Sequence, residues 1–77
     1  MSRRDKVAAI IQSVAKADLP GDDESLFDAG TVDSFALVDM VAGLEKEFGL
    51  KIPDSDVNPR KFESVERIEA YLASRGA

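Results

Sequence analysis

The strongest candidate for chemistry in this sequence is a hydroxyl group at the predicted start of a helix. Ser34 follows Asp33, after the helix-breaking residue Gly30. A serine in that place usually caps the helix by accepting a hydrogen bond from an unpaired backbone N–H group. Asp33 can cap equally well, and the Ser34 hydroxyl then stands exposed at the positive end of the helix dipole, where an esterified phosphate is stabilised. Taken alone, the Asp-Ser pair favours a simple cap.

The residue types that are missing exclude most other chemistry. The chain has no Cys, His or Trp, which rules out thiolate or imidazole catalysis, disulfides and zinc-finger ligation. Paired carboxylates work as acid and base only in a cleft that shifts one pKa. A chain of 77 residues buries a core too small to leave room for such a cleft. We therefore predict that the protein is not an enzyme.

A calcium site is the next alternative. Asp54, Asp56 and Asn58 reproduce the start of an EF-hand loop. Pro59 then stands where the turn requires Gly, and Val65 stands where the bidentate Glu belongs. The sequence therefore predicts no dedicated metal site.

Charge and composition bound the class of protein and of partner. Hydrophobic residues make up 44% and charged residues 32%, the balance of a soluble globular domain. The N-terminus lacks the apolar region of a signal peptide, and no apolar run approaches the ~20 residues of a membrane span. We expect one cytoplasmic domain over residues 1–77. The net charge is −5, with nine acids and one base between Asp18 and Phe48, which disfavours nucleic acid and favours basic protein partners.

Apolar spacing predicts an all-α fold of three helices. The first runs from Ser2 to about Ala17, the second from Asp33 or Ser34 to Phe48, and the third from Glu63 or Ser64 to about Ser74. Two prolines leave residues 53–59 room for one helical turn at most. The long loop from Asp18 to Asp33 needs buried anchors, for which the candidates are Leu26, Phe27 and Val32.

The second predicted helix has more apolar surface than a small bundle needs. One face carries its core residues, with Leu37 near the boundary, and a further stripe is formed by Phe35, Val38 and Ala42. Gly43 lies inside this helix at a cost of roughly 1 kcal/mol relative to Ala. We expect it to be tolerated because a neighbouring side chain approaches closely there.

These residues together resemble the acyl carrier protein family. The resemblance extends in the same order over nearly the whole chain, and four segments carry it: Asp33-Ser34-Phe35, Val38-Asp39-Met40-Val41, Leu44-Glu45 with Phe48, and Ile52-Pro53-Asp54. It implies a four-helix bundle with three main helices, a short third helix and a long first loop.

The resemblance also implies a function. Ser34 would carry 4′-phosphopantetheine, transferred from coenzyme A by a phosphopantetheinyl transferase, and its thiol would hold an acyl or aminoacyl group as a thioester. Asp33 would help to orient the transferase, Mg²⁺ and coenzyme A. The remaining partners would be a loading ligase and downstream acyl-transfer or synthase enzymes. We expect the carrier itself to be a monomer. The partner-recognition residues implied are Asp33, Phe35, Val38, Asp39, Ala42 and Glu45.

Departures from the family pattern narrow the type of carrier. Phe35 replaces the usual Leu, as in carriers of the D-alanine type, and the G-G-x-S motif of modular peptide-synthetase carriers is absent. A discrete acyl or aminoacyl carrier of a dedicated pathway fits these departures. The alternative is an unmodified acidic interaction domain in which Asp33 and Ser34 only cap a helix.

Overall fold

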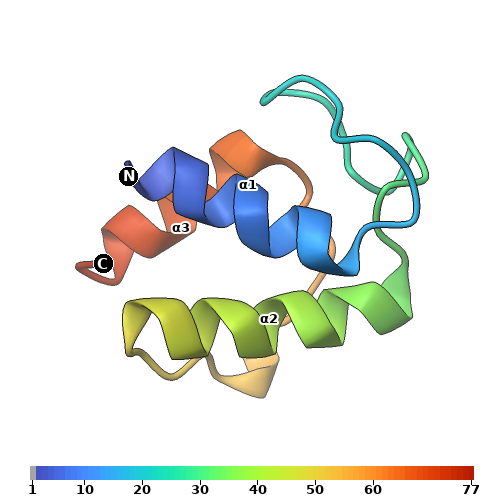
Figure 1. The fold of residues 1–77 in the computed structure, drawn as a ribbon. Helices are drawn as coiled ribbons and strands as arrows, with labels where there is room; N and C mark the ends of the chain where they lie inside the picture. The colour runs from blue at the N-terminus through green and yellow to red at the C-terminus, as the bar shows by residue number, and fades with distance from the viewer. Residues whose placement is uncertain (1) are drawn as a thin grey trace.

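The fold consists of three α-helices joined by long irregular segments (Figure 1). The computed structural model describes residues 2–77 and contains α1 (Arg3–Val14), α2 (Ser34–Phe48), α3 (Val65–Ser74) and the 3-10 turn η1 (Asp54–Asp56). The all-α prediction is confirmed. A bundle of four α-helices is not found within residues 2–77, because the segment between two prolines forms only the three-residue turn η1.

The first helix is shorter than predicted. Ser2 caps α1, its Oγ accepting a hydrogen bond from the Asp5 N–H. The helix ends at Val14, not near Ala17, because Ala15 has extended backbone angles. The Lys16 N–H then donates to the Thr31 carbonyl at 2.9 Å, so this backbone donor bonds to the loop before α2 and not to α1.

The core lies where α1 packs against both α2 and α3 (Figure 1). Leu37 of α2 is buried in it, and Phe48 is half-buried against it. Gly43 permits a close approach of α1, since a Cβ atom there would lie 2.9 Å from Ile10 Cγ2. The expected close neighbour of Gly43 is therefore confirmed.

The loop between α1 and α2, residues 15–33, is anchored in the core. Leu26 is fully buried, Val32 is nearly so, and Phe27 packs against the cluster while half-buried. The Leu26 N–H donates to the Glu63 carbonyl at 2.7 Å, and the Glu66 N–H donates to the Asp22 carbonyl at 2.9 Å. These two bonds fasten the loop to the start of α3, so the prediction of packed anchors is confirmed.

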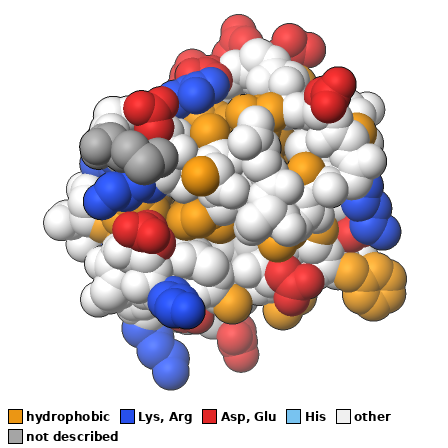
Figure 2. Space-filling view, viewed as in Figure 1, with side chains coloured by type: hydrophobic (Ala, Val, Ile, Leu, Met, Phe, Trp, Pro, Cys, Tyr) orange, Lys and Arg blue, Asp and Glu red, His pale blue; other side chains and the backbone are white. Residues whose placement is uncertain are grey.

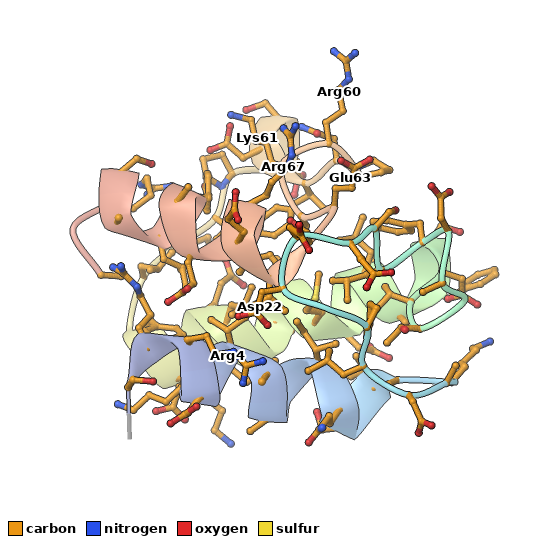
Figure 3. All side chains as sticks on the ribbon, turned by 90° about the horizontal axis from the view of Figure 1, so that it is seen from above. Arg4, Asp22, Arg60, Lys61, Glu63 and Arg67 are labelled. Carbon is orange, nitrogen blue, oxygen red and sulfur yellow. The ribbon has the colours of Figure 1, made fainter. Side chains whose placement is uncertain are left out.

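A bidentate ion pair joins the loop to α1. Figure 3 shows Arg4 of α1 and Asp22 of the loop facing each other. Arg4 Nη2 and Nε donate to the two Asp22 oxygens at 2.6 and 3.0 Å. The Arg4 side chain, through this hydrogen bond, holds the pKa of the Asp22 carboxyl below its usual range, so Asp22 stays ionised.

Phe62 is a core residue that the sequence pattern did not reveal. It is fully buried, and its ring lies 5.2 Å from the Tyr71 ring of α3. The Tyr71 hydroxyl donates to Asp56 Oδ2 at 2.7 Å, which ties η1 to α3.

Within residues 2–77, no helix is long and apolar enough to cross a membrane.

Candidate functional site

Asp33, not Ser34, caps α2. Asp33 Oδ1 accepts a hydrogen bond from the Ala36 N–H at 2.8 Å, and Asp33 has the extended backbone of a cap residue. Ser34 is the first residue of the helix, and its side chain is exposed. The choice that the sequence left open is thus resolved, and the Ser34 hydroxyl is left out of the capping interaction at the positive end of α2.

Lys16 joins this site from the loop after α1. Its Nζ lies 2.8 Å from Asp33 Oδ2, so the two carboxylate oxygens of Asp33 have separate partners. The hydrogen bond from Lys16, followed by that from the Ala36 N–H, holds the pKa of the Asp33 carboxyl below its usual range. No local sequence pattern connects Lys16 with Asp33, because their contact depends on the path of the loop.

The loop before α2 fixes where the helix begins. Gly30 has a positive φ of 76°, which suits glycine, and turns the chain toward α2. The next residue, Thr31, is fully buried, and its Oγ1 donates to the Asp18 carbonyl at 2.8 Å. Val32 is buried directly before the Asp33 cap. A buried, hydrogen-bonded segment therefore leads to an exposed Ser34.

Four of the six expected partner-recognition residues lie on the exposed side of α2. Phe35 is 83% exposed and Val38 61%, and both are large apolar side chains that would normally be buried. Asp39 and Ala42 are exposed beside them. The surplus apolar stripe thus faces solvent as expected, whereas Leu37 belongs to the core.

Glu45 has a structural contact that its sequence position did not reveal. Its Oε2 accepts a hydrogen bond from the Ile52 N–H at 2.7 Å, and the residue is half-buried. Glu45 also lines a hollow between α2 and residues 51–57, together with Val38 and Ala42. One of its oxygens therefore holds the segment that forms the other wall of this hollow.

Acidic side chains lie on the loop before α2, away from the start of the helix. They gather along the top of Figure 2, over the loop that joins α1 to α2 in Figure 1.

Asp56 of the partial EF-hand match already has two partners. It accepts a hydrogen bond from the Tyr71 hydroxyl, and Lys61 Nζ lies 3.7 Å from its carboxylate. Over residues 2–77 no cluster of three potential metal-binding side chains is found. What the site offers is an exposed hydroxyl beside an ionised carboxylate, which suits covalent modification.

Comparison with known proteins identifies a family. The model of the family described as "Phosphopantetheine attachment site" matches residues 5–72. The D-alanyl carrier protein of Lactobacillus acidophilus is 31% identical over 75 residues, which cover 96% of this chain and 95% of the relative. The D-alanyl carrier protein of Streptococcus pyogenes serotype M1 is 39% identical over 46 residues, covering 60% of this chain and 58% of the relative.

Two solved structures share the fold. One is a crystal structure of an engineered Bradyrhizobium japonicum glycine:[carrier protein] ligase complexed with a carrier protein from Agrobacterium tumefaciens and AMP. A chain in it matches with a TM-score of 0.80 and 26% identity, over 91% of this chain and 97% of its own length. The other contains the B. japonicum ligase with glycylated carrier protein, with a TM-score of 0.73, 28% identity and coverage of 88% and 95%.

Proposed function

The chain belongs to the phosphopantetheine attachment site family and is a carrier protein with a covalent 4′-phosphopantetheine, and we propose that Ser34 bears this group. The observation that supports Ser34 is the capping of α2 by Asp33, which leaves the neighbouring hydroxyl exposed and unused by the fold. The start of α2 also favours the negative charge of the phosphodiester.

In the modification, the Ser34 hydroxyl loses its proton and its oxygen bonds to the phosphorus of coenzyme A that carries the pantetheine. The pyrophosphate linkage breaks, and adenosine 3′,5′-bisphosphate leaves. Asp33 contributes by fixing the first turn of α2 and by staying ionised next to Ser34. The attached group supplies a thiol that holds a carboxylic acid as a thioester. Catalysis at every step belongs to partner enzymes.

We propose that the cargo is a small amino acid and that a carrier-protein ligase loads it. The supporting similarity is twofold, since curated relatives are D-alanyl carrier proteins and the solved neighbours occur with glycine:[carrier protein] ligases. Phe35, which stands after the serine where many carriers have Leu, agrees with this type of carrier.

The exposed side of α2 is the surface we propose for the ligase and the transferase. Phe35 and Val38 offer apolar area next to the site of modification, and Asp39 adds charge for a basic partner. Such a surface combines hydrophobic contact with charge complementarity, which sets the orientation of the partner.

The test is intact mass after incubation with coenzyme A, Mg²⁺ and a broad-specificity phosphopantetheinyl transferase. We expect a gain of one phosphopantetheinyl group in the wild type and none in Ser34→Ala. Ser55→Ala, which also removes an exposed hydroxyl, is the matched control and should gain the group. If Ser34→Ala still gains the group, another residue is the site of modification. If the wild type gains no group, the result supports the unmodified interaction domain.

The cargo is tested separately on the modified protein. Incubation with ATP, a glycine:[carrier protein] ligase or a D-alanine ligase, and the matching amino acid should add one aminoacyl group that hydroxylamine removes. A modified protein that takes fatty acyl groups from an acyl-carrier synthetase, and no amino acid from either ligase, would contradict the aminoacyl proposal while leaving Ser34 in place.

A further inference from the structure

We propose that a basic patch on the outer side of α3 binds a carboxylate-rich segment of a partner protein. The basic patch consists of Arg60, Lys61 and Arg67, which Figure 3 shows together on the side of α3 that faces away from α1. They line a hollow of about 310 Å³ with three residues of α3: Ala70, Tyr71 and Ser74. This volume is at the small end of small-molecule sites, and the hollow is open, which favours the surface of a partner over an enclosed ligand.

The fold leaves the charges of the basic patch largely available. Arg67 Nε lies 3.5 Å from Glu63 Oε1, and Lys61 Nζ lies 3.7 Å from Asp56 Oδ1. Both contacts are long, and the pair of Arg67 with Glu63 is exposed, so it contributes little to stability. Asp56 is half-buried, but it is held by the Tyr71 hydroxyl at 2.7 Å and does not depend on Lys61. Arg60 forms no ion pair with any of residues 2–77. A partner can therefore replace these contacts at little cost to the fold.

The side chains suit carboxylates. Arginine presents a planar fork of donors that matches a carboxylate in two parallel hydrogen bonds, and the basic patch has two arginines. Lys61 Nζ lies 5.7 Å from the centre of the Tyr71 ring, a contact that helps to hold the ammonium at the edge of the hollow. The Oε1 of the neighbouring Glu63 lies 3.5 Å from Arg67 Nε, so a carboxylate is already drawn to this arginine.

The charge of the whole molecule favours a short acidic segment over an extended polyanion. The net charge is −5, and nine acids lie between Asp18 and Phe48. A nucleic acid or an anionic membrane presents negative charge over a wide area, so it would meet these acids as well as the basic patch. A segment of a few acidic residues can contact the basic patch alone.

The basic patch also differs in sign from the acidic segment between Asp18 and Phe48, which contains Ser34. A partner with a basic area and an acidic segment would match both surfaces in only one orientation, because the reverse orientation brings like charges together. The inference does not depend on the function proposed for Ser34. The unmodified full chain, or its Ser34→Ala variant, is sufficient to test it.

The experiment follows backbone amide signals by NMR while a blocked oligoglutamate peptide is added. We expect shifts confined to residues 60–61, 67 and 70–74, with an affinity that falls as salt is raised. Arg60→Gln combined with Arg67→Gln should weaken the affinity by roughly 2- to 30-fold, the range for two exposed charge pairs. Lys46→Gln combined with Lys51→Gln removes the same charge elsewhere and should leave it unchanged.

Several results would overturn the proposal. Equal weakening in the two double variants would mean that only net charge matters. If the NMR signals shift outside the basic patch, or do not shift at all, the basic patch is not a docking surface. Oligoglutamine is the neutral control and should cause no shifts. Stronger binding to duplex DNA or phosphatidylglycerol vesicles than to oligoglutamate, lost in the arginine variant, would assign the basic patch to a nucleic acid or a membrane.

Discussion

At the scale of single residues, the site depends on a division of roles between Asp33 and Ser34. Two neighbouring residues can each cap a helix, and only one of them is needed. Asp33 takes this role with one oxygen and holds Lys16 with the other. The Ser34 hydroxyl is then available for modification without a change in the fold. The residue that we propose to be modified and the residue that caps the helix are therefore separate.

Two serines at helix starts should differ in their effect on stability. Ser34→Ala should change the free energy of unfolding by less than about 0.5 kcal/mol, because an exposed side chain outside the cap is lost. Ser64 caps α3, its buried Oγ accepting from the Arg67 N–H at 3.1 Å, so Ser64→Ala should cost about 1 kcal/mol or more. Urea unfolding measures both. Equal losses would contradict the assignment of Asp33 as the cap of α2.

The pH dependence of stability should contain a contribution from Asp33. Its pKa in the folded state is lower than the ordinary 3.8, so its contribution is present above that value and is lost as the pH falls through the lowered pKa. Asp33→Asn keeps a capping oxygen and should remove the part of the free energy of unfolding that is lost in acid.

NMR titration of the Asp33 carboxyl group tests whether Lys16 lowers its pKa. Lys16→Gln removes the ammonium next to Asp33 Oδ2, so the pKa of Asp33 should rise toward its ordinary value. Lys46→Gln is a control that removes one charge from an exposed position elsewhere. An Asp33 pKa that is unchanged in Lys16→Gln would show that the ion pair does not form in solution.

At the scale of elements, the approach of α1 to α2 depends on Gly43. Gly43→Ala gains roughly 1 kcal/mol in helix propensity, but its Cβ would lie 2.9 Å from Ile10 Cγ2, and overpacking costs about 1–3 kcal/mol. We expect no net gain in the free energy of unfolding. In an Ile10→Ala background the clash is absent, and the same change should stabilise by about 1 kcal/mol. An equal gain in both backgrounds would contradict the close contact.

The elements also show what the sequence could predict. Apolar spacing located α2 and α3, because a helix that buries one face repeats its apolar residues every three to four positions. It placed the end of α1 too late, since Lys16 bonds to Thr31 across the loop, a contact between residues that no local pattern connects. Asp33 and Ser34 were named as competing caps, and only the geometry decided between them.

At the scale of the whole molecule, apolar anchoring holds the loop and α3 more strongly than charge does. Phe62 is fully buried against Tyr71, so Phe62→Ala should cost about 3–5 kcal/mol, a large part of the roughly 4–12 kcal/mol expected for a domain of this size. Arg4→Gln removes exposed ion pairs with Asp22 and Asp5 and should have a much smaller effect that fades at high salt. Thermal unfolding compares the two. A larger loss in Arg4→Gln would reverse this order.

Phe62 also marks the limit of sequence reasoning at this scale. Phe62 lies three residues before Val65 and six before Ile68, the spacing of the buried face of α3, but it precedes the predicted start of the helix and was therefore not assigned to the core. Leu26 and Phe27 were recognised as anchors because they lie together in an acidic loop. Phe62 has no such apolar neighbour, since it stands between Lys61 and Glu63.

The central claim is that the phosphopantetheinyl group is on Ser34, and the most direct test locates it in the chain. Cleavage before Asp33 and Asp39 releases residues 33–38, in which Ser34 is the only residue with a hydroxyl side chain. After treatment with transferase and coenzyme A, mass spectrometry should find the added group on this fragment alone. Finding it on a fragment that contains Ser25 or Ser55, or on none, would contradict the account.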